Sequence, residues 1–209
     1  MSIYYKYPQY LWAKEIYSII EEHDILNNRK IIDAPSGNGI ISYWLYKNYN
    51  IKDIELVDNN LQRLGAAKKY MPSLKISCKD ILEINCIDRN DDIWLLINSL
   101  YCLEGGDKII SSLKNRFKYI IGIFPYIDHK NYKSFVKKNP DFHIPLELNE
   151  NDTIDLFAKF GYKLLFKKDI THIPFHNFNY EIIKKSFNIL DKYFKSLSGA
   201  YWISLFKRT

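Results

Sequence analysis

Short β-branched runs alternate along the chain with longer stretches in which apolar residues recur at helical spacing. The first helical stretch has Pro8 in its first turn and Trp12 and Ile16 on one face, which predicts an amphipathic helix that ends near residues 27–28. Further helices are predicted at residues 40–49, from 61 to just before 72, from 106 to about 116, from 149 to 161, and around 181–195. Strands are predicted at residues 30–33, 53–57, 74–78, 93–97, 119–124, 162–166 and 201–206.

This alternation predicts an α/β fold with a doubly wound sheet, in which ligands bind at the carboxyl ends of the strands. Residues 93–97 are apolar at every position, which is typical of a strand in the middle of a parallel sheet. Polar side chains end four of the predicted strands, namely Asp33, Asp58, Asp80 and Asn98. The sequence therefore predicts a ligand site along this edge of the sheet.

The loop after the first strand contains two glycines, Gly37 and Gly39, just before an apolar helical pattern that begins at Ile40. Glycine has no Cβ, so the backbone can adopt unusual dihedral angles and a ligand can approach it closely. A strand, a tight loop and a helix N-terminus together are typical of sites that hold nucleotide-like ligands, because backbone N–H groups point at a carboxylate or phosphate.

The strand ends indicate which ligand this is. Asp58 ends the second strand, where a carboxylate can accept hydrogen bonds from the two hydroxyls of a ribose. Asp80 can accept a hydrogen bond from an exocyclic amino group, and the backbone beside Ile81 can pair with a ring nitrogen. Asp33 and Asn98 face the middle, where an amine or a cationic centre would lie. These residues together predict an adenosine joined to a short group that carries an amine and a carboxylate.

The stretch from Asp33 to Gly39, Asp-Ala-Pro-Ser-Gly-Asn-Gly, resembles the Asp-x-Gly-x-Gly-x-Gly motif of the Rossmann-like (class I) S-adenosylmethionine-dependent methyltransferases. Pro35 stands where that motif has its first glycine, and proline fixes φ and removes one N–H group. The family's acidic end of strand two and its Asp after strand three match Asp58 and Asp80. The resemblance covers residues 29–124, and the strand pattern extends it to the end of the chain.

This resemblance implies a single methyltransferase domain with S-adenosylmethionine (SAM) as its cofactor. It implies a three-layer α/β/α fold around a mostly parallel seven-stranded sheet whose last strand is antiparallel. We expect a helical arm at residues 1–28 and lid-like insertions at 126–148 and 168–198. The implied cofactor-binding residues are Asp33, Ala34, Pro35, Ser36, Gly37, Gly39, Asp58, Asn59, Asp80, Ile81 and Asn98.

Two other interpretations use the same residues. Any one of the three aspartates alone could be a helix cap or a turn residue. A dinucleotide-dependent dehydrogenase would also use the carboxylate of strand two, but its Gly-x-Gly-x-x-Gly motif requires a third glycine, and position 42 is Ser42. The three aspartates at successive strand ends therefore favour SAM.

Composition limits the class of protein. The 209 residues are 47% hydrophobic and 26% charged, which is typical of one globular domain. No apolar run is long enough to span a membrane, and no apolar segment of a signal peptide is present at the start. Three cysteines without a Cys-x-x-Cys pair favour the reducing cytoplasm and argue against a zinc site, so no metal is expected.

The methyl acceptor is the least constrained part of the prediction. The candidate catalytic base is His129, and Tyr101 and Tyr126 are candidate substrate-binding residues; further candidates are Glu104, His143, His172 and His176. Residues 98–101 keep the ends of the Asn-Pro-Pro-Tyr motif of amino-methyltransferases but have neither proline. A small-molecule acceptor with a hydroxyl or amine is therefore favoured. The alternatives are a tRNA or rRNA acceptor, which the net charge of +6 supports, and a non-catalytic module that keeps the fold.

Overall fold

The protein is described by a computed structural model, which covers residues 7–84, 92–100, 106–113, 116–129, 133, 137, 148–170 and 201–209. Its strands are β1 (Ile31–Asp33), β2 (Ile54–Asp58), β3 (Lys75–Cys78), β4 (Asp92–Ile97), β5 (Phe117–Pro125), β6 (Tyr162–Ile170) and β7 (Tyr201–Arg208). Its helices are α1 (Tyr7–Glu22), α2 (Ile40–Tyr49), α3 (Leu61–Tyr70), the 3-10 helix η2 (Ile81–Glu83), α4 (Gly106–Leu113) and α6 (Glu150–Lys159).

The strands form one sheet in the order β3-β2-β1-β4-β5-β7-β6. Strands β1 to β5 pair in parallel, and β7 pairs antiparallel with both β5 and β6. The predicted doubly wound seven-stranded sheet with an antiparallel last strand is therefore confirmed. From β1, the chain adds β2 and β3 in one direction along the sheet and then adds β4 and β5 in the opposite direction. The strand order therefore reverses between β1 and β4.

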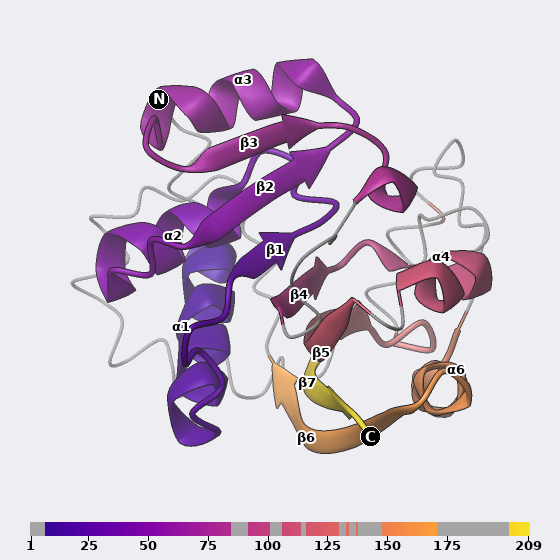
Figure 1. The fold of residues 1–209 in the computed structure, drawn as a ribbon. Helices are drawn as coiled ribbons and strands as arrows, with labels where there is room; N and C mark the ends of the chain where they lie inside the picture. Colours follow the sequence, from indigo (N-terminus) through magenta and orange to yellow (C-terminus); the bar gives the residue numbers. More distant parts are fainter. Residues whose placement is uncertain are drawn as a thin grey trace.

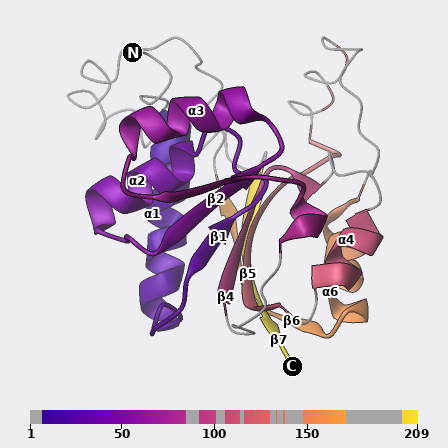
Figure 2. The same ribbon diagram turned by 45° about the horizontal axis from the view of Figure 1, so that its top comes forward.

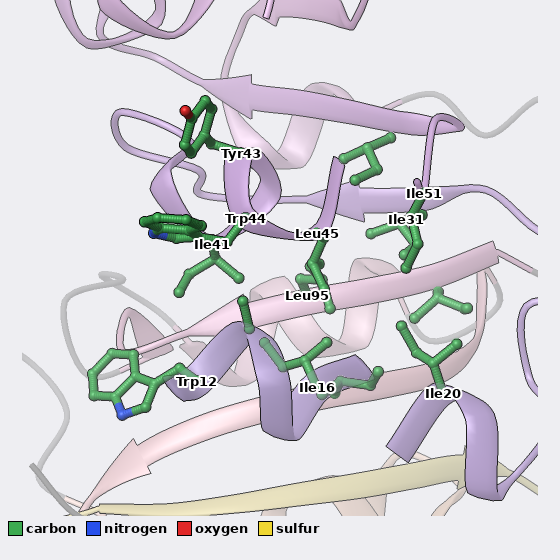
Figure 3. Close-up of a cluster of buried hydrophobic side chains, with 14 of the residues drawn as sticks. Trp12, Ile16, Ile20, Ile31, Ile41, Tyr43, Trp44, Leu45, Ile51 and Leu95 are labelled. Atoms are coloured by element: carbon green, nitrogen blue, oxygen red, sulfur yellow. The ribbon is translucent and has the colours of Figure 1, made fainter. Parts of the chain in front are cut away.

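Helices cover both faces of the sheet and complete the three layers (Figures 1 and 2). One apolar core joins α1, α2 and α3 to the side of the sheet that carries Ile31 and Leu95. Figure 3 shows Ile16 of α1 pointing toward Leu95, with Leu45 of α2 above them. The second core joins α4 and α6 to the opposite face of the sheet, on which Trp94 and Leu96 of β4 lie. Since β4 is buried on both faces, its continuous apolar run is explained.

The element boundaries follow local backbone signals. Helix α2 spans the predicted residues, and the predicted caps are confirmed: Asn60 accepts hydrogen bonds from the backbone of residues 62 and 63, and Asn149 from that of Asp152. The prediction that the first helix ends near residues 27–28 is wrong, since α1 ends at Glu22. The reason is that Asp24 and Asn28 adopt left-handed φ angles of 46° and 53°, which a helix cannot contain.

Strand β6 is longer than predicted, because it continues to Ile170 and pairs with β7 along that length. Residues 168–170 therefore belong to the sheet, although the second insertion was predicted to begin at 168. The predicted helix at 181–195 lies outside the described residues, and of the insertion predicted at 126–148 the structure describes residues 126–129, 133, 137 and 148. In the part of the chain that the structure describes, no helix is both long and apolar enough to cross a membrane.

A buried carboxylate in the middle of β2 joins three strands. Glu55 forms ion pairs with Lys30 at 2.8 Å and with Lys75 of β3 at 2.9 Å, and it accepts a hydrogen bond from Ser77 Oγ at 2.6 Å. Burial alone would raise the pKa of Glu55, but these hydrogen bonds outweigh burial and lower the pKa from 4.5 to about 2. The cluster therefore stabilises the fold only while Glu55 is ionised.

We expect the free energy of unfolding to fall as the pH drops from 4.5 toward 2, because protonation of Glu55 is more favourable in the unfolded chain than in the folded one. Glu55→Gln should cost about 2 kcal/mol at pH 7 and much less near pH 2. Urea denaturation across this pH range measures both. Asp128→Asn is the control, since its pair with Lys133 is exposed and should contribute little at either pH. Equal losses for Glu55→Gln at pH 7 and at pH 2 would contradict the assignment.

Candidate functional site

The loop after β1 turns sharply from the strand into α2. Its Ala34–Pro35 peptide bond is cis, and Gly37 and Gly39 have φ angles of +57° and +67°, in the left-handed region that favours glycine. Ser36 N donates to Val57 O at 2.9 Å, which ties the loop to β2. The loop is therefore held in one conformation beside the carboxyl ends of β1 and β2.

Strand β4 holds the other side of this loop. The indole Nε1 of Trp94 donates to Ala34 O at 2.7 Å, and Ala34 N donates to Leu95 O at 3.2 Å. Trp94 is completely buried, so its N–H group requires a partner inside the protein, and the loop supplies it. The backbone N–H and C=O groups of Ala34 are thus both hydrogen-bonded to β4.

The two glycines of the loop have different surroundings. A Cβ on Gly39 would lie 2.8 Å from Leu56 Cδ1 and 3.1 Å from Met71 Cε, because α2 approaches the core closely at this residue. A Cβ on Gly37 would have no protein atom within 4 Å. Gly39 is therefore required for packing, whereas Gly37 leaves open space at the surface of the loop.

Asp58, at the end of β2, is 4% exposed and connects two turns. Its Oδ2 accepts a hydrogen bond from Gly37 N at 2.7 Å, and its Oδ1 accepts one from Asn60 N at 2.9 Å. A carboxylate has about four lone-pair positions, so each oxygen keeps one further acceptor position for a ligand. Asp58 therefore both shapes the glycine loop and carries the negative charge beside it.

Asp33 is a second buried carboxyl group at the same edge. It is 2% exposed, and Ser42 Oγ in the first turn of α2 donates a hydrogen bond to its Oδ2 at 2.6 Å. Burial raises the pKa of Asp33 to about 7, the bond from Ser42 opposes this change, and the charge of Asp58 adds to it. A cation bound nearby would favour the ionised form of Asp33, because opposite charge stabilises a carboxylate.

The ends of β2 and β3 carry an apolar border. Asp80 caps η2 by accepting a hydrogen bond from Leu82 N at 2.8 Å, and Ile81 beside it is buried. Leu61 at the start of α3 and Leu82 in η2 are 70% and 50% exposed, so both present apolar surface at this edge. Asn59 is exposed at the same edge and accepts a weak hydrogen bond from Cys78 Sγ through its backbone oxygen.

Unpartnered polar atoms lie where the strand order reverses. Asp33 of β1 is in register with Leu95 of β4, so Ser36 and Asn98 follow the two strands at equal distances along the chain. Among the described residues, no partner is found for the buried atoms Ser36 Oγ, Asn98 Oδ1 and Ser99 Oγ. Buried polar atoms are rarely left unpaired in folded proteins, so these three oxygens are candidate acceptors for a polar ligand at this edge of the sheet.

The candidate acceptor residues lie at the end of β5. The hydroxyl of Tyr126 donates to Asp169 Oδ1 of β6 at 2.5 Å, and burial, this hydrogen bond and the charge of Glu150 raise the pKa of Tyr126 above its ordinary value. His129 lies in the turn that follows, where its backbone N donates to Tyr126 O at 2.9 Å. The candidates Tyr101, Glu104, His143, His172 and His176 lie outside the described residues.

No protein-family model matches the sequence, and a search of curated proteins finds no match. Solved structures do match over most of the chain. The magnesium protoporphyrin IX methyltransferase of Synechocystis PCC 6803, crystallised with bound S-adenosylhomocysteine (SAH), is 12% identical with a TM-score of 0.64, over 94% of this chain and 83% of that one. The plantazolicin methyltransferase BpumL, also in complex with SAH, is 14% identical with a TM-score of 0.65, over 96% and 84%.

A SAM-dependent methyltransferase from Clostridium acetobutylicum is 14% identical with a TM-score of 0.63, over 97% of this chain and 92% of that one. The chain has the class I methyltransferase fold. The β1 loop and the ends of β2 to β4 form one continuous edge of the sheet, and the predicted cofactor-binding residues all end or follow these four strands. The donor set suits SAM: two carboxylates, unpartnered oxygens on both central strands, and open space at Gly37.

Sequence reasoning missed three contributors to this edge. Ser42 was considered only as a missing glycine, yet it donates a hydrogen bond to Asp33; a serine within an otherwise apolar helical pattern was the available signal in the sequence. Trp94 was treated as core, although a tryptophan in an aliphatic strand must find a partner for its N–H group. Asp169 gave no signal, because the predicted sixth strand ended before it.

Proposed function

We propose that the chain is a SAM-dependent methyltransferase that transfers a methyl group to a hydroxyl or amine of a small molecule, such as a sugar or another metabolite. The observation that carries this proposal is the set of unpartnered oxygens of Ser36, Asn98 and Ser99 at the reversal point of the sheet. They lie on the same edge as Asp58 and the open face of Gly37, in a fold shared with SAM-dependent methyltransferases.

Different groups of predicted cofactor residues would bind different parts of SAM. Asp58 would accept hydrogen bonds from the ribose hydroxyls through its remaining lone pairs, with Asn59 beside it. Asp80, Ile81 and the exposed Leu61 and Leu82 would surround the adenine, since an aromatic base favours apolar contacts around a few polar ones.

The amino-acid part would lie over the β1 loop. Because the N–H groups of Ala34, Ser36, Gly37 and Gly39 already donate within the protein, the N-terminus of α2 is the part of this loop that suits its carboxylate. Asp33 and Asn98 suit its ammonium group and the nearby sulfonium, and this positive charge would keep Asp33 ionised at neutral pH.

SAM supplies an electrophilic methyl group on a sulfonium, and its transfer to a nucleophile is an in-line displacement that leaves SAH. Alignment of donor and acceptor supplies much of the rate of such a step. A hydroxyl or ammonium acceptor must also lose a proton, so a base is needed for these substrates. We propose His129 for this role and Tyr126 as an acceptor-binding residue, because both follow the end of β5 next to the reversal point.

Isothermal titration calorimetry with SAM and SAH tests the proposal directly. We expect both to bind at one site per chain, and we expect methyl transfer to a panel of hydroxyl and amine metabolites when SAM carries a labelled methyl group. Absence of any heat with either compound would refute the enzyme function. Binding of SAH without transfer to any acceptor class would instead favour the non-catalytic module that keeps this fold.

A nucleic-acid acceptor is the second candidate, because the net charge is +6 and Lys163 is exposed on β6 at the edge of the sheet. Lys167 and Lys168 of the same strand are paired with Glu150 and Glu15. Binding to bulk tRNA should then be strong and should fall steeply between 50 and 200 mM salt, as counterion release requires. No salt-sensitive binding of tRNA would remove this candidate.

His129→Ala should lower the rate of methyl transfer at least tenfold and leave the affinity for SAH unchanged, since a proton acceptor is needed only in the chemical step. Turnover with labelled SAM and calorimetry with SAH measure the two quantities. His23→Ala is the matched control, because His23 packs against Phe166 and is not at the carboxyl edge. An unchanged rate in His129→Ala would exclude His129 as the base.

A further inference from the structure

A cavity lies at the amino ends of β1 and β2, the edge of the sheet opposite the β1 loop. It has a volume of about 560 Å³ and is lined by residues 26–29, which precede β1, and by residues 50–53, which precede β2. The two connections run side by side, because Ile31 and Ile54, the first residues of their strands, are in register. Pockets for small ligands have volumes of about 300–1,000 Å³, so this cavity is large enough for a small molecule.

Backbone hydrogen bonds fix both walls of this cavity. Arg29 N donates to Leu26 O at 2.8 Å on one side, and Asn50 N donates to Leu45 O on the other. Asn28 and Asn50 have left-handed φ angles of 53° and 55°, which asparagine tolerates better than most residues. Both asparagines are exposed, and their side chains form no hydrogen bond in the described chain. Their amide groups are therefore available to a ligand.

Arg29 is held in place by its neighbours but keeps unused hydrogen-bond donors. Its Nη1 donates to Ile25 O at 3.1 Å and to Asn27 O at 3.4 Å. Its Cζ lies 5.3 Å from the ring centroid of Tyr119 in β5. The Nε of Arg29 is buried and has no hydrogen-bond partner in the described chain, where no carboxylate pairs with this residue either. A guanidinium is always charged and carries five N–H donors, so Arg29 is a fixed cation without a counter-ion.

The charged side chains that line the cavity are positive in balance. Lys52 is exposed and forms no ion pair within the described chain, and Asp53 is the only acidic residue among those of the lining. Arg29 and Lys52 thus supply a cation from each wall. A carboxylate has only two oxygens, whereas a phosphate group carries up to two negative charges and three strong acceptor oxygens. Phosphate therefore suits a site with donors on two sides and an excess of positive charge.

We propose that this cavity is a second ligand site, which binds a phosphate group, free or on a small molecule, through Arg29 and Lys52. The inference does not depend on the proposed function. Strand β2 has five residues and a strand rises about 3.3 Å per residue, so the cavity lies roughly 16 Å from the edge at which Asp58 ends β2. A phosphate bound here would not overlap a ligand at that edge, and it would stabilise the folded chain.

Isothermal titration calorimetry with sodium phosphate tests the proposal, with sodium chloride keeping the ionic strength constant. We expect saturable binding of one phosphate per chain and a rise in the melting temperature as phosphate is added. Glycerol 2-phosphate, titrated in the same way, distinguishes an organic phosphate from the free anion by the tighter binding of one of them. No saturable binding of either compound would overturn the proposal, and so would equally tight binding of sodium acetate, which offers only a carboxylate.

Two variants of the lining should change phosphate affinity in opposite directions. Lys52→Gln should weaken binding about fivefold without unfolding the chain, because Lys52 is exposed. Asp53→Asn should strengthen binding, because it removes the only negative charge of the lining. Lys108→Gln is the matched control, since Lys108 is an exposed lysine on α4, which covers the opposite face of the sheet. Equal losses in Lys52→Gln and Lys108→Gln, or weaker binding in Asp53→Asn, would overturn the proposal.

Arg29→Lys tests the other cation, because it keeps the charge and loses the planar fork of donors. Phosphate affinity should fall about fivefold, and the melting temperature without phosphate measures any separate loss of stability. Unchanged phosphate affinity in Arg29→Lys would overturn the role of the guanidinium. SAH is titrated beside phosphate with the unmodified chain. Binding of phosphate without SAH would refute the proposed function and leave this site standing, whereas binding of SAH without phosphate would do the reverse.

Discussion

Replacing Asp58 with alanine is expected to weaken the binding of SAH at least tenfold, or about 1.4 kcal/mol. Two effects act in the same direction. The ribose would lose its carboxylate acceptor, and Gly37 N and Asn60 N would lose the oxygens that hold them at 2.7 and 2.9 Å. Calorimetry with SAH measures the change in affinity.

Asp58→Asn separates these two effects, because an asparagine oxygen can still accept one of the backbone bonds while the charge is lost. It should fall between the alanine variant and the unmodified chain. Asp155→Ala is the matched control, since Asp155 is an exposed aspartate on α6, away from the carboxyl edge. The melting temperature of each variant should be measured beside its SAH affinity, so that a local change in the glycine loop is distinguished from unfolding of the whole chain. An affinity in Asp58→Ala within twofold of the unmodified value would exclude Asp58 from the site.

Gly39→Ala should cost about 2–4 kcal/mol of stability. The φ angle of +67° is unfavourable for alanine, and its methyl group would lie 2.8 Å from Leu56 Cδ1, in a core where Leu56 is completely buried. The side chains of Leu56 and Met71, both completely buried, would have to shift to make room for it. Urea denaturation measures the loss.

Gly37→Ala is the matched comparison two residues earlier. Its φ angle of +57° carries a similar backbone cost of about 1 kcal/mol, but no protein atom lies near the new methyl group. Stability should therefore fall less than in Gly39→Ala, whereas SAH affinity should fall at least tenfold because the methyl group would occupy the open surface that a ligand needs. Equal stability losses in the two variants, or full SAH affinity in Gly37→Ala, would contradict these roles.

The sheet was predictable from the sequence because each strand is a local pattern. The run at residues 93–97 predicted a central buried strand, and β4 is that strand, buried on both faces. The caps Asn60 and Asn149 were predictable for the same reason, since a cap and its helix are adjacent in sequence. The early end of α1 was not, because the left-handed turn at Asp24 has no glycine to mark it.

The internal contacts of the site were not predictable, because they join residues that are far apart in sequence. Trp94 reaches Ala34 across 60 positions, and Asp58 reaches Gly37 across 21. The sequence placed Asp33, Asp58, Asp80 and Asn98 at strand ends, but a strand end does not reveal which side chains meet there.

The position of β7 between β5 and β6 has a consequence for the order of folding. Among the strands that the structure describes, β6 pairs only with β7, so β6 joins the sheet through residues 201–208 and not before them. Insertion of β7 closes contacts across 82 positions, such as Ser204 with Gly122, and long-range pairing of this kind is slow. The antiparallel side of the sheet is therefore completed by pairs that are distant in sequence, later than the local pairs of the parallel strands.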